Sequence, residues 1–431
     1  MSSAREVLVI GAGMAGAIAA LSARRAGAKV RVVRRALGAT ALSSGAIDVA
    51  ADPVVPAGVW NAHLVSPIEA ARAWSRLRPN HPYAVLRDRL DRLEESLRFA
   101  AACLPELLVP PLERNALLPT PLGTVKPSAM GQRNVLGADV GTLPSRVALV
   151  QFRVNPAWDA RMIAQGIEEA ARALGRNVSV AVVESDFLRE VEDALRSPYE
   201  LGERLDAPGE LRRLADDLRR RLPEGTEAVL LPPVLGRRVE DLAGQLGVLL
   251  RGVRCAEILS AAPSLPGIRL QEALDLALKR EGVRLEHAEV RVVDGEHEGS
   301  FMFSVGDGGE LVRPDSVVLA TGKYLGGGIA RGERFSETVF DLPVIAGGRA
   351  VTNEYIGHLL SETVVQEQAA FRAGVRVDAT LRPLRADGKP AHANLFAAGA
   401  VLCGYDPATD KTGLGVAIFT GYLAGEAAAR L

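Results

Sequence analysis

The chain has 431 residues, which is enough for two domains around a large buried core. Its 51 lysines and arginines nearly balance its 52 aspartates and glutamates, and the net charge of −1 excludes the basic field that nucleic-acid binding needs. The three cysteines, Cys103, Cys255 and Cys403, are scattered without a CxxC pair, which excludes a readable disulfide framework, cysteine-ligated metal site or iron–sulfur site.

A strand–helix–strand unit is predicted at the N-terminus. Residues 7–10 form a short apolar run typical of a buried strand, residues 14–26 an alanine-rich helix, and residues 29–33 a second strand. Glu6 cancels the charge of Arg5, and glycines interrupt the apolar run, so we do not interpret it as a signal peptide. No other uncharged apolar run reaches the ~18 residues of a spanning helix, and we expect a cytoplasmic protein without a membrane span.

The turn of this unit, GAGMAG at 11–16, matches the GxGxxG pattern of nucleotide-binding folds. Gly11 permits the tight turn, Gly13 lets a phosphate approach the backbone, and Gly16 lets the helix and the strand touch. The amides at the start of the helix would then bind the phosphate. The sequence therefore predicts nucleotide or flavin binding at this turn.

The second strand ends in Arg34-Arg35, where such a unit usually carries an acid for a ribose hydroxyl. A phosphate turn without that acid suits a mononucleotide, and Arg34 and Arg35 could bind a phosphate bidentately. Alternatively, the two arginines are a solvated strand end, because arginine is this chain's common cation. The next loop, Ser43-Ser44-Gly45, either offers hydroxyl and amide donors to a ligand or forms an ordinary serine turn.

Signals of the nucleotide fold return late in the chain, after a middle part that predicts helices at residues 67–77 and 83–102. Residues 267–293 predict a helix, a turn at Gly282 and a strand pair, and residues 316–320 a strand that ends in Thr321-Gly322. Residues 394–431 predict a strand, a glycine loop and a helix. These segments are expected to form one domain that a long insertion interrupts.

In this order, the segments resemble the flavoproteins of the fumarate reductase and succinate dehydrogenase type. They resemble more closely the B-subunit family of anaerobic glycerol-3-phosphate dehydrogenases. The stretches that carry the resemblance are LSSGAIDV at 42–49, HPYAVL at 81–86, TPLGTV at 120–125, LPGIRLQEAL at 265–274, DATLRPL at 378–384 and NLFAAGAVLCGYDP at 394–407.

The resemblance implies an α/β fold, with a Rossmann-like doubly wound flavin-binding domain and an inserted α+β cap domain. The expected segments are residues 1–60, 265–330 and 390–431 for the flavin-binding domain, 61–264 for a cap and partner domain, and 331–389 for a cap or connecting segment. The implied cofactor is FMN, which has no adenosine ribose for an acid to hold. FAD stays the alternative, with a different ribose contact.

The expected site residues lie in the glycine turn and in the loops that follow strands. For the cofactor they are Gly11, Gly13, Gly16, Arg34, Ser43, Ser44, Gly45, Thr321, Gly322, Gly399, Gly413, Leu414 and Gly415. The start of the last helix could stabilise negative charge on the N1–O2 edge of a reduced flavin. Lys323 and Arg382 are candidate cations for a phosphorylated substrate. His392 and Lys411 are candidate catalytic groups, because alcohol oxidation needs a base, although a lone histidine is more often structural. We expect no metal.

The family resemblance implies a flavin subunit that oxidises sn-glycerol 3-phosphate to dihydroxyacetone phosphate. Electrons would pass to quinone through a second flavoprotein subunit and a membrane-associated iron–sulfur subunit, which would hold this chain at the periphery of the inner membrane. One alternative is a non-catalytic electron-transfer or assembly subunit with the same fold. Another is a stand-alone oxidoreductase of the fumarate reductase type.

Overall fold

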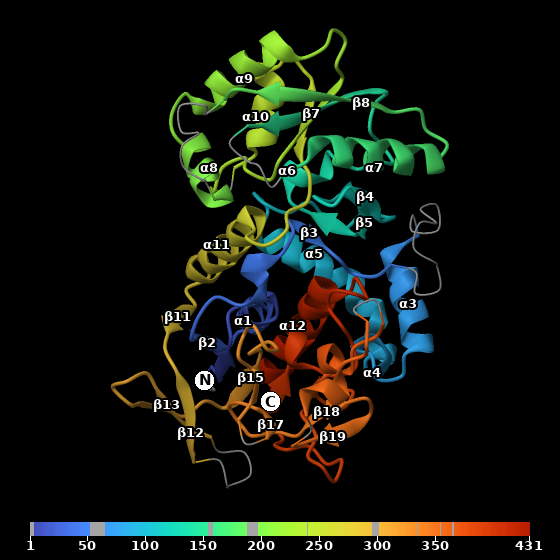
Figure 1. Cartoon of the computed structure of the whole chain (residues 1–431). Coiled ribbons are helices and arrows are strands. Elements are labelled where there is room, and N and C mark those ends of the chain that lie inside the picture. Colours follow the sequence, from blue (N-terminus) through green and yellow to red (C-terminus); the bar gives the residue numbers. More distant parts are fainter. Residues whose placement is uncertain are drawn as a thin grey trace. The chain divides into compact units, whose positions relative to one another are not determined.

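The computed structural model describes residues 4–51, 65–153, 158–187, 197–238, 240–294, 301–332, 334–353, 355–363 and 366–431 (Figure 1). The chain separates into two compact units. Unit 1 comprises Met1–Thr40, Ile68–Cys103 and Leu274–Leu431, and unit 2 comprises Ala41–Pro67 and Leu104–Ala273. The division into five segments stays a prediction, and parts of it, such as residues 52–64, lie outside the described residues.

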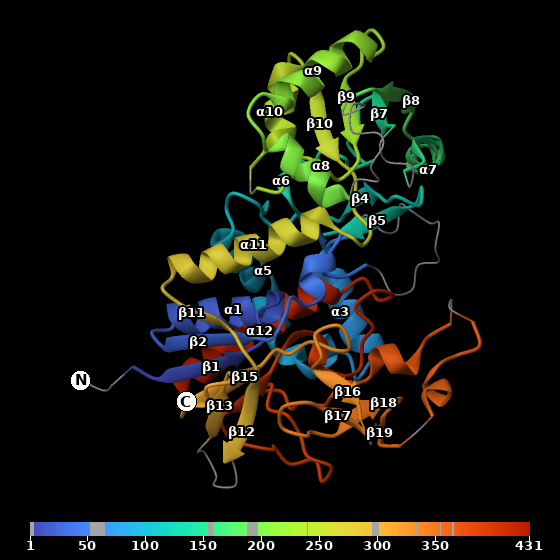
Figure 2. The ribbon, with the colours of Figure 1, turned by 60° about the vertical axis from the view of Figure 1, so that its left-hand side comes forward.

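Unit 1 is built on a five-stranded parallel sheet in the order β11-β2-β1-β15-β21, of which Figure 2 shows the first four strands side by side. The strands are β1 (Glu6–Ile10), β2 (Lys29–Arg34), β11 (Arg284–His287), β15 (Ser316–Leu319) and β21 (Leu395–Ala397). The apolar residues of β1, β15 and β21 are all buried, as expected for central strands of a parallel sheet. This sheet confirms the predicted Rossmann-like fold, and the carboxyl ends of its strands lie along one edge.

Two helices of unit 1, α1 (Met14–Arg25) and α12 (Gly413–Arg430), pack directly against each other. A Cβ atom built on Gly421 would lie 2.4 Å from the backbone oxygen of Ala15, and one built on Gly425 would lie 2.1 Å from that of Ala19. Only glycine at these two positions allows the helix backbones to approach so closely. The contact fixes the first two turns of α1 against the middle of α12.

The prediction of one continuous helix at 83–102 is wrong, because the structure divides this segment into three shorter helices. The structure has α4 (Pro82–Val85), the 3₁₀ helix η2 (Arg87–Arg92) and α5 (Leu93–Cys103) instead. At Leu86 the backbone leaves the helical region, with φ −102° and ψ 25°. No glycine or proline marks this break, so the apolar periodicity could not locate it. The predicted helix at 67–77 is confirmed as α3 (Pro67–Leu77).

The remaining elements of unit 1 form small antiparallel sheets and single turns of 3₁₀ helix. They are β12 (Val290–Asp294), β13 (Met302–Val305), β14 (Glu310–Val312), β16 (Ile329–Arg331), β17 (Phe335–Glu337), β18 (Val344–Ala346), β19 (Arg349–Val351), η4 (Ile356–Leu359), η5 (Ala369–Arg372), β20 (Gly374–Val375) and η6 (Gly399–Val401). The helix α11 (Leu265–Arg280) leads from the sequence of unit 2 into that of unit 1.

Unit 2 contains a four-stranded parallel sheet in the order β10-β9-β7-β8. Its main elements are β7 (Arg146–Phe152), α7 (Ala160–Ala173), β8 (Ser179–Ser185), α8 (Pro198–Leu205), α9 (Glu210–Arg221), β9 (Ala228–Leu231), α10 (Leu242–Leu249) and β10 (Arg254–Glu257). Shorter elements are η1 (Ala39–Leu42), β3 (Ala46–Ile47), β4 (Ala116–Pro119), β5 (Val125–Ser128), β6 (Met130–Gly131) and α6 (Arg133–Leu136). Across the described part of the chain, every helix is too short or too polar to cross a bilayer.

Candidate functional site

The glycine turn after β1 is packed so tightly that side chains are excluded. Gly11 has φ +109°, and a Cβ atom on it would lie 2.2 Å from the backbone oxygen of Ala320, which follows β15. A Cβ atom on Gly16 would lie 1.9 Å from the backbone oxygen of Gly11. The Gly11 amide donates to Val33 O of β2 at 2.7 Å. The turn therefore joins the carboxyl ends of β1, β2 and β15.

Gly13 stands at the N-cap of α1 and offers no capping side chain. A remote hydroxyl takes part of that role, because the Met14 amide donates to Thr40 Oγ1 at 2.9 Å. A Cβ atom on Gly13 would lie 3.0 Å from the same oxygen. The helix start thus presents bare backbone, a hydroxyl and the positive end of the helix dipole, which together suit a phosphate. Sequence reasoning missed Thr40.

The loops after β15 and β21 meet the same edge of the sheet. The Thr321 hydroxyl is buried and has no hydrogen-bond partner among the described residues, and Gly322 adopts φ +75°. Gly399 adopts φ +77°, and a Cβ atom on it would lie 2.5 Å from the Cβ atom of Ala15 in α1. The Gly399 amide donates to Thr420 Oγ1 at 2.9 Å, which ties this loop to α12.

Arg34, the last residue of β2, is engaged inside the protein. Its side chain is 7% exposed, and its two terminal nitrogens donate to the carboxylate of Asp275 at 2.7 and 2.6 Å. His287 lies 3.1 Å from one of them. Arg35 is exposed, and its guanidinium lies against Gly327. The carboxylate of Asp275 therefore neutralises the charge of Arg34. Arg34 occupies the strand end where other nucleotide-binding units carry an acid for the ribose.

The first turn of α12 is open. In the described part of the chain, the amides of Gly413, Leu414 and Gly415 have no hydrogen-bond partner. Thr412 stands at the N-cap, but its side chain does not cap the helix. Its hydroxyl lies instead 3.4 Å from Nε2 of His81. Open amides at a helix start can bind an electron-rich oxygen of a ligand.

Lys323, which follows Thr321-Gly322, is buried against Tyr405, in the segment that precedes α12. Its ammonium donates to the backbone oxygens of Phe371 and Tyr405, and it lies 5.5 Å from the centre of the Tyr405 ring. Burial lowers the pKa of Lys323 to about 8. The nearby loop is held by Arg372, which donates to both carboxylate oxygens of Asp410 at 2.8 and 2.6 Å. Lys323 is therefore a buried cation of the site, and backbone oxygens take the place of its water shell.

The other predicted substrate and catalytic residues lie apart from one another. The Arg382 side chain donates to Asp378 at 2.9 Å. Lys411 has a left-handed backbone, with φ 54°, and its ammonium donates to Ala408 O at 3.1 Å. His392 precedes β21, whereas Gly399 follows it, so the histidine lies towards the opposite edge of the parallel sheet. There its ring packs on those of Phe301 and Phe340, at 4.9 and 6.1 Å between centroids.

The predicted loop Ser43-Ser44-Gly45 belongs to unit 2. Its backbone is held there by hydrogen bonds from Ser264 to Ser43 O and from Ser260 N to Ser44 O. Among the described residues, the buried hydroxyls of Ser43 and Ser44 have no partner. The loop could therefore donate two hydroxyl hydrogens to a ligand, and its role stays a prediction.

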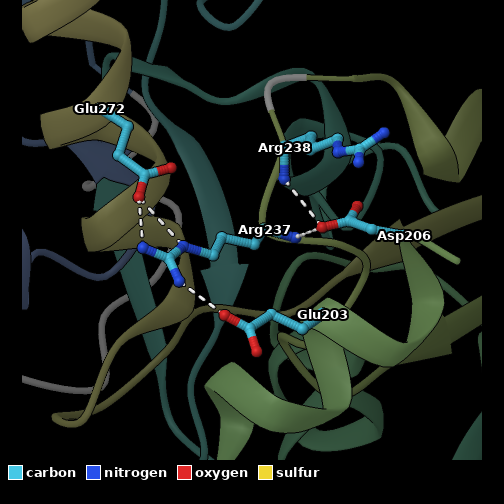
Figure 3. A pocket seen from close by; sticks show the side chains of 5 residues that line it. All are labelled: Glu203, Asp206, Arg237, Arg238 and Glu272. Carbon is cyan, nitrogen blue, oxygen red and sulfur yellow. Dashed lines mark hydrogen bonds and ion pairs between the residues drawn. The ribbon is translucent and has the colours of Figure 1, made fainter.

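Unit 2 also has a pocket of about 320 Å³ lined by charged residues alone: Glu203, Asp206, Arg237, Arg238 and Glu272 (Figure 3). Arg237 pairs with Glu203 at 2.6 Å and with Glu272 at 2.8 Å. Figure 3 shows the Arg238 side chain directed away from Arg237. Because the lining charges largely neutralise each other, this pocket offers a weaker site than the edge of the unit 1 sheet.

The site in unit 1 fits a flavin on observations of this structure. The glycine turn and the start of α1 form a cradle that a Cβ atom would fill, and the buried Thr321 hydroxyl and the α12 amides lack partners among the described residues. Sequence reasoning missed Thr40, His81 and Tyr405. His81 and Tyr405 lie in HPYAVL and in NLFAAGAVLCGYDP, so attention to polar residues inside those stretches could have found them. Nothing in the sequence singled out Thr40.

Comparison with known proteins shows to which families the chain is similar. A family model described as FAD binding domain matches residues 6–416. The B-subunit of a probable anaerobic glycerol-3-phosphate dehydrogenase from Halobacterium salinarum is 33% identical over 444 residues, covering 100% of this chain and 99% of the relative. The B-subunit of the anaerobic glycerol-3-phosphate dehydrogenase from Yersinia pestis is 28% identical over 432 residues, covering 96% and 95%. These matches confirm the resemblance and the expected flavin cofactor.

Two solved structures with a likeness to this chain have low sequence identity to it. The 3-ketosteroid delta1-dehydrogenase from Sterolibacterium denitrificans shares 12% identity at a TM-score of 0.41, covering 99% of both chains. The open conformation of a flavocytochrome c3 fumarate reductase shares 14% identity at a TM-score of 0.38, covering 100% of this chain and 78% of that structure.

Proposed function

Because the chain belongs to the FAD binding domain family and to the B-subunit family of anaerobic glycerol-3-phosphate dehydrogenases, we propose that it is the flavin-containing subunit of such an enzyme. In this proposal the enzyme oxidises sn-glycerol 3-phosphate to dihydroxyacetone phosphate, and electrons leave through partner subunits to quinone. The observation that carries the proposal is the meeting of four features at one edge of the unit 1 sheet. They are the glycine turn, the Thr321-Gly322 loop, the Gly399 loop and the open start of α12.

We propose FMN as the bound flavin, with FAD as the alternative. The end of β2 carries no acid for an adenosine ribose, and Arg34 is buried there in its bidentate pair with Asp275. In this proposal the phosphate lies at the start of α1, near Gly13 and Thr40, and the ring lies towards α12. When bound, the flavin supplies the acceptor for the hydride of the substrate alcohol.

For the chemistry on the substrate we retain Lys411 and His392 as candidate bases and Lys323 and Arg382 as candidate cations. Lys411 is the better placed of the two bases, since it lies next to the start of α12, whereas His392 lies towards the other edge of the sheet. Lys323 is better suited to fixing charge near the ring than to binding a solvated phosphate, because it is buried and already donates to two backbone oxygens.

The proposal includes two partners, a second flavoprotein subunit and a membrane-associated iron–sulfur subunit. Among the described residues, no group of three or more His, Cys, Asp and Glu side chains could hold a metal ion. A flavin buried in this chain then needs redox centres of other subunits to reach a quinone in the bilayer. Association with the inner membrane would follow from the partner.

Two experiments test the proposal. The flavin released from the denatured protein is identified and counted, and we expect about one FMN per chain. Stoichiometric FAD would contradict FMN alone, and no flavin even after reconstitution would contradict the flavoprotein proposal. Reduction of a quinone analogue by glycerol 3-phosphate is then measured for the chain alone and for the reconstituted complex. We expect turnover in the complex only. A complex that stays fully active after loss of this flavin would favour an assembly role.

A further inference from the structure

His81 has no part in the function proposed above, yet it is fully buried next to the open start of α12. Its ring packs against the rings of Trp74, Tyr83 and Tyr405, with centroids 4.8 to 5.6 Å apart. It also caps α4, because its Nδ1 accepts the Tyr83 amide at 3.1 Å. One ring nitrogen of His81 therefore contacts α4 and the other contacts the N-cap residue of α12, and the role of each contact depends on which nitrogen carries the proton.

The Tyr83 contact shows which nitrogen carries the proton. A backbone amide can only donate, so Nδ1 of His81 must be unprotonated and the proton of the neutral ring must lie on Nε2. Burial, together with the positive charges of Arg372 and Arg78, lowers the pKa of His81 to about 3, which keeps the ring neutral. Nε2–H therefore donates to the hydroxyl oxygen of Thr412 at 3.4 Å.

That hydrogen bond changes what Thr412 can do. A threonine at an N-cap ordinarily accepts a hydrogen bond from an amide of the first helical turn. Here the hydroxyl oxygen faces His81, Thr412 has ψ −1° in place of the usual extended value, and no side-chain cap forms. Among the described residues the Thr412 hydroxyl proton has no acceptor, although the residue is fully buried.

A second buried donor at the same place points to a ligand. Tyr405 packs its ring edge-on against His81 and is fully buried, and its hydroxyl has no hydrogen-bond partner in the described part of the chain. A buried hydroxyl without a partner destabilises the fold unless something accepts its proton. His81 thus contacts both Thr412, at the open start of α12, and the ring of Tyr405, and each of these two residues has a hydroxyl proton without an acceptor among the described residues.

We propose that His81 is a positioning residue of the flavin site: it holds the Thr412 hydroxyl away from the first-turn amides of α12, so that these amides stay open to the pyrimidine oxygen of the flavin. The inference rests on the proposed placement of the flavin ring at α12. It goes beyond that placement by naming the side chain that keeps the helix uncapped. Because His81 acts through Thr412, its effect should vanish when the Thr412 hydroxyl is removed.

The first test compares His81→Asn with His81→Gln. The asparagine carbonyl can still accept the Tyr83 amide but its side chain is too short to reach Thr412, whereas the glutamine amide extends to the position of Nε2. We expect the flavin dissociation constant of the apoprotein to rise about fivefold in His81→Asn, the ratio that an average N-cap hydrogen bond represents, and to stay near wild type in His81→Gln. The bound flavin's absorption spectrum should shift only in His81→Asn. Equal affinities in the two variants would overturn the proposal.

The second test is a double-mutant cycle with Thr412→Val, which removes the hydroxyl at nearly constant shape. In that background His81→Asn should leave the flavin dissociation constant unchanged. A fivefold loss that persists without the hydroxyl would mean that His81 acts through packing, and would overturn the positioning role.

A third variant separates this inference from the proposed function. Leu414→Pro removes one first-turn amide at a helix position where proline is tolerated. If flavin binding is unchanged in Leu414→Pro, the ring does not lie at α12 and the proposed placement fails. If Leu414→Pro weakens flavin binding while His81→Asn does not, only the role of His81 fails.

The last measurement observes His81 in the wild-type protein. Histidine-labelled protein is examined by ¹⁵N NMR, and the signal of His81 is assigned by its loss in His81→Gln. We expect the neutral Nε2–H tautomer throughout pH 5 to 8. The Nδ1–H tautomer, or protonation within this range, would overturn the proposal.

Discussion

Two buried polar clusters, one in each unit, differ in whether their hydrogen bonds are complete. In unit 2 the cluster around Arg269 is closed: the guanidinium donates to Glu257 at 2.7 and 2.8 Å, to Gln132 at 3.1 Å and to the backbone oxygens of Leu235 and Gly236. Arg269 and Glu257 are both fully buried. Each guanidinium nitrogen has an acceptor, so this cluster needs no ligand.

In unit 1 the cluster of His81, Tyr405 and Thr412 is open, because two buried hydroxyl protons and three helix amides have no acceptor among the described residues. Native proteins rarely leave buried donors unpaired. The comparison teaches that burial and polarity alone do not identify a binding site. Incomplete pairing is the feature on which we base the proposed site, and the four predictions below test the distinction.

The largest effect is expected from breaking the closed cluster. Glu257→Ala leaves Arg269 fully buried without its carboxylate, which should lower the free energy of unfolding by about 3–5 kcal/mol. Chemical denaturation measures it. The matched control is Glu203→Ala, which breaks the half-exposed pair with Arg237 and should change stability by less than about 1 kcal/mol. Similar losses of unfolding free energy in the two variants would show that the closed cluster stabilises the protein no more than a surface ion pair does.

The next effect concerns the phosphate cradle. Gly13→Val places a branched side chain against Thr40 and should abolish flavin binding, measured by fluorescence titration of the apoprotein. The control is Gly38→Ala, since no heavy atom lies within 4 Å of a Cβ atom built on Gly38. We expect this control to bind flavin like wild type. Retained binding in Gly13→Val would remove the start of α1 from the site.

The third prediction compares the removal of an unpaired tyrosine hydroxyl with the removal of a paired one. Tyr405→Phe deletes a buried hydroxyl without a partner in the described chain, so stability should hold or rise while ligand affinity falls about tenfold. Tyr422→Phe is the matched change at a hydroxyl that is bonded to Arg92 and Glu95. It should lose stability and leave ligand binding unchanged. If Tyr405→Phe loses stability and keeps its affinity, the cluster is not a ligand site.

The smallest effect is a pH dependence from Lys323. Burial lowers its folded-state pKa to about 8, below the ordinary 10.5. Between these values the unfolded chain holds the proton and the folded protein does not, so the contribution of Lys323 to stability should rise with pH. Denaturation from pH 8 to pH 10.5 measures this slope. In Lys323→Met the slope should decrease, and an unchanged slope would refute the shift.

Much of the fold was predictable because local patterns specify it. The glycine turn, the alanine-rich first helix, and the strands that precede Thr321 and Gly399 each carry their own signal of apolar run and turn residue. The break of the 83–102 segment at Leu86 carries no such signal, and the prediction there was wrong.

The candidate site was predictable only where it consists of backbone. A glycine in such a turn predicts that other backbone atoms approach it closely, and this prediction agrees with the packing around Gly11 and Gly16. Side-chain roles depend on which distant residues meet. Arg34 looked like a free cation until Asp275, 241 residues away, was found to pair with it. His81 reaches Thr412 across 331 residues. No local pattern encodes such encounters.

The glycine contact between α1 and α12 also has a consequence for when, during synthesis of the chain, the proposed flavin site can form. Ser22 of α1 donates to Tyr422 O of α12 across 400 residues of sequence. During synthesis α1 therefore leaves the ribosome long before α12, the helix that we propose to complete the flavin site. Such distant pairings form slowly. If the proposed site is right, a nascent chain stalled before Gly413 would lack the α12 part of it, and flavin should bind only after α12 has been synthesised.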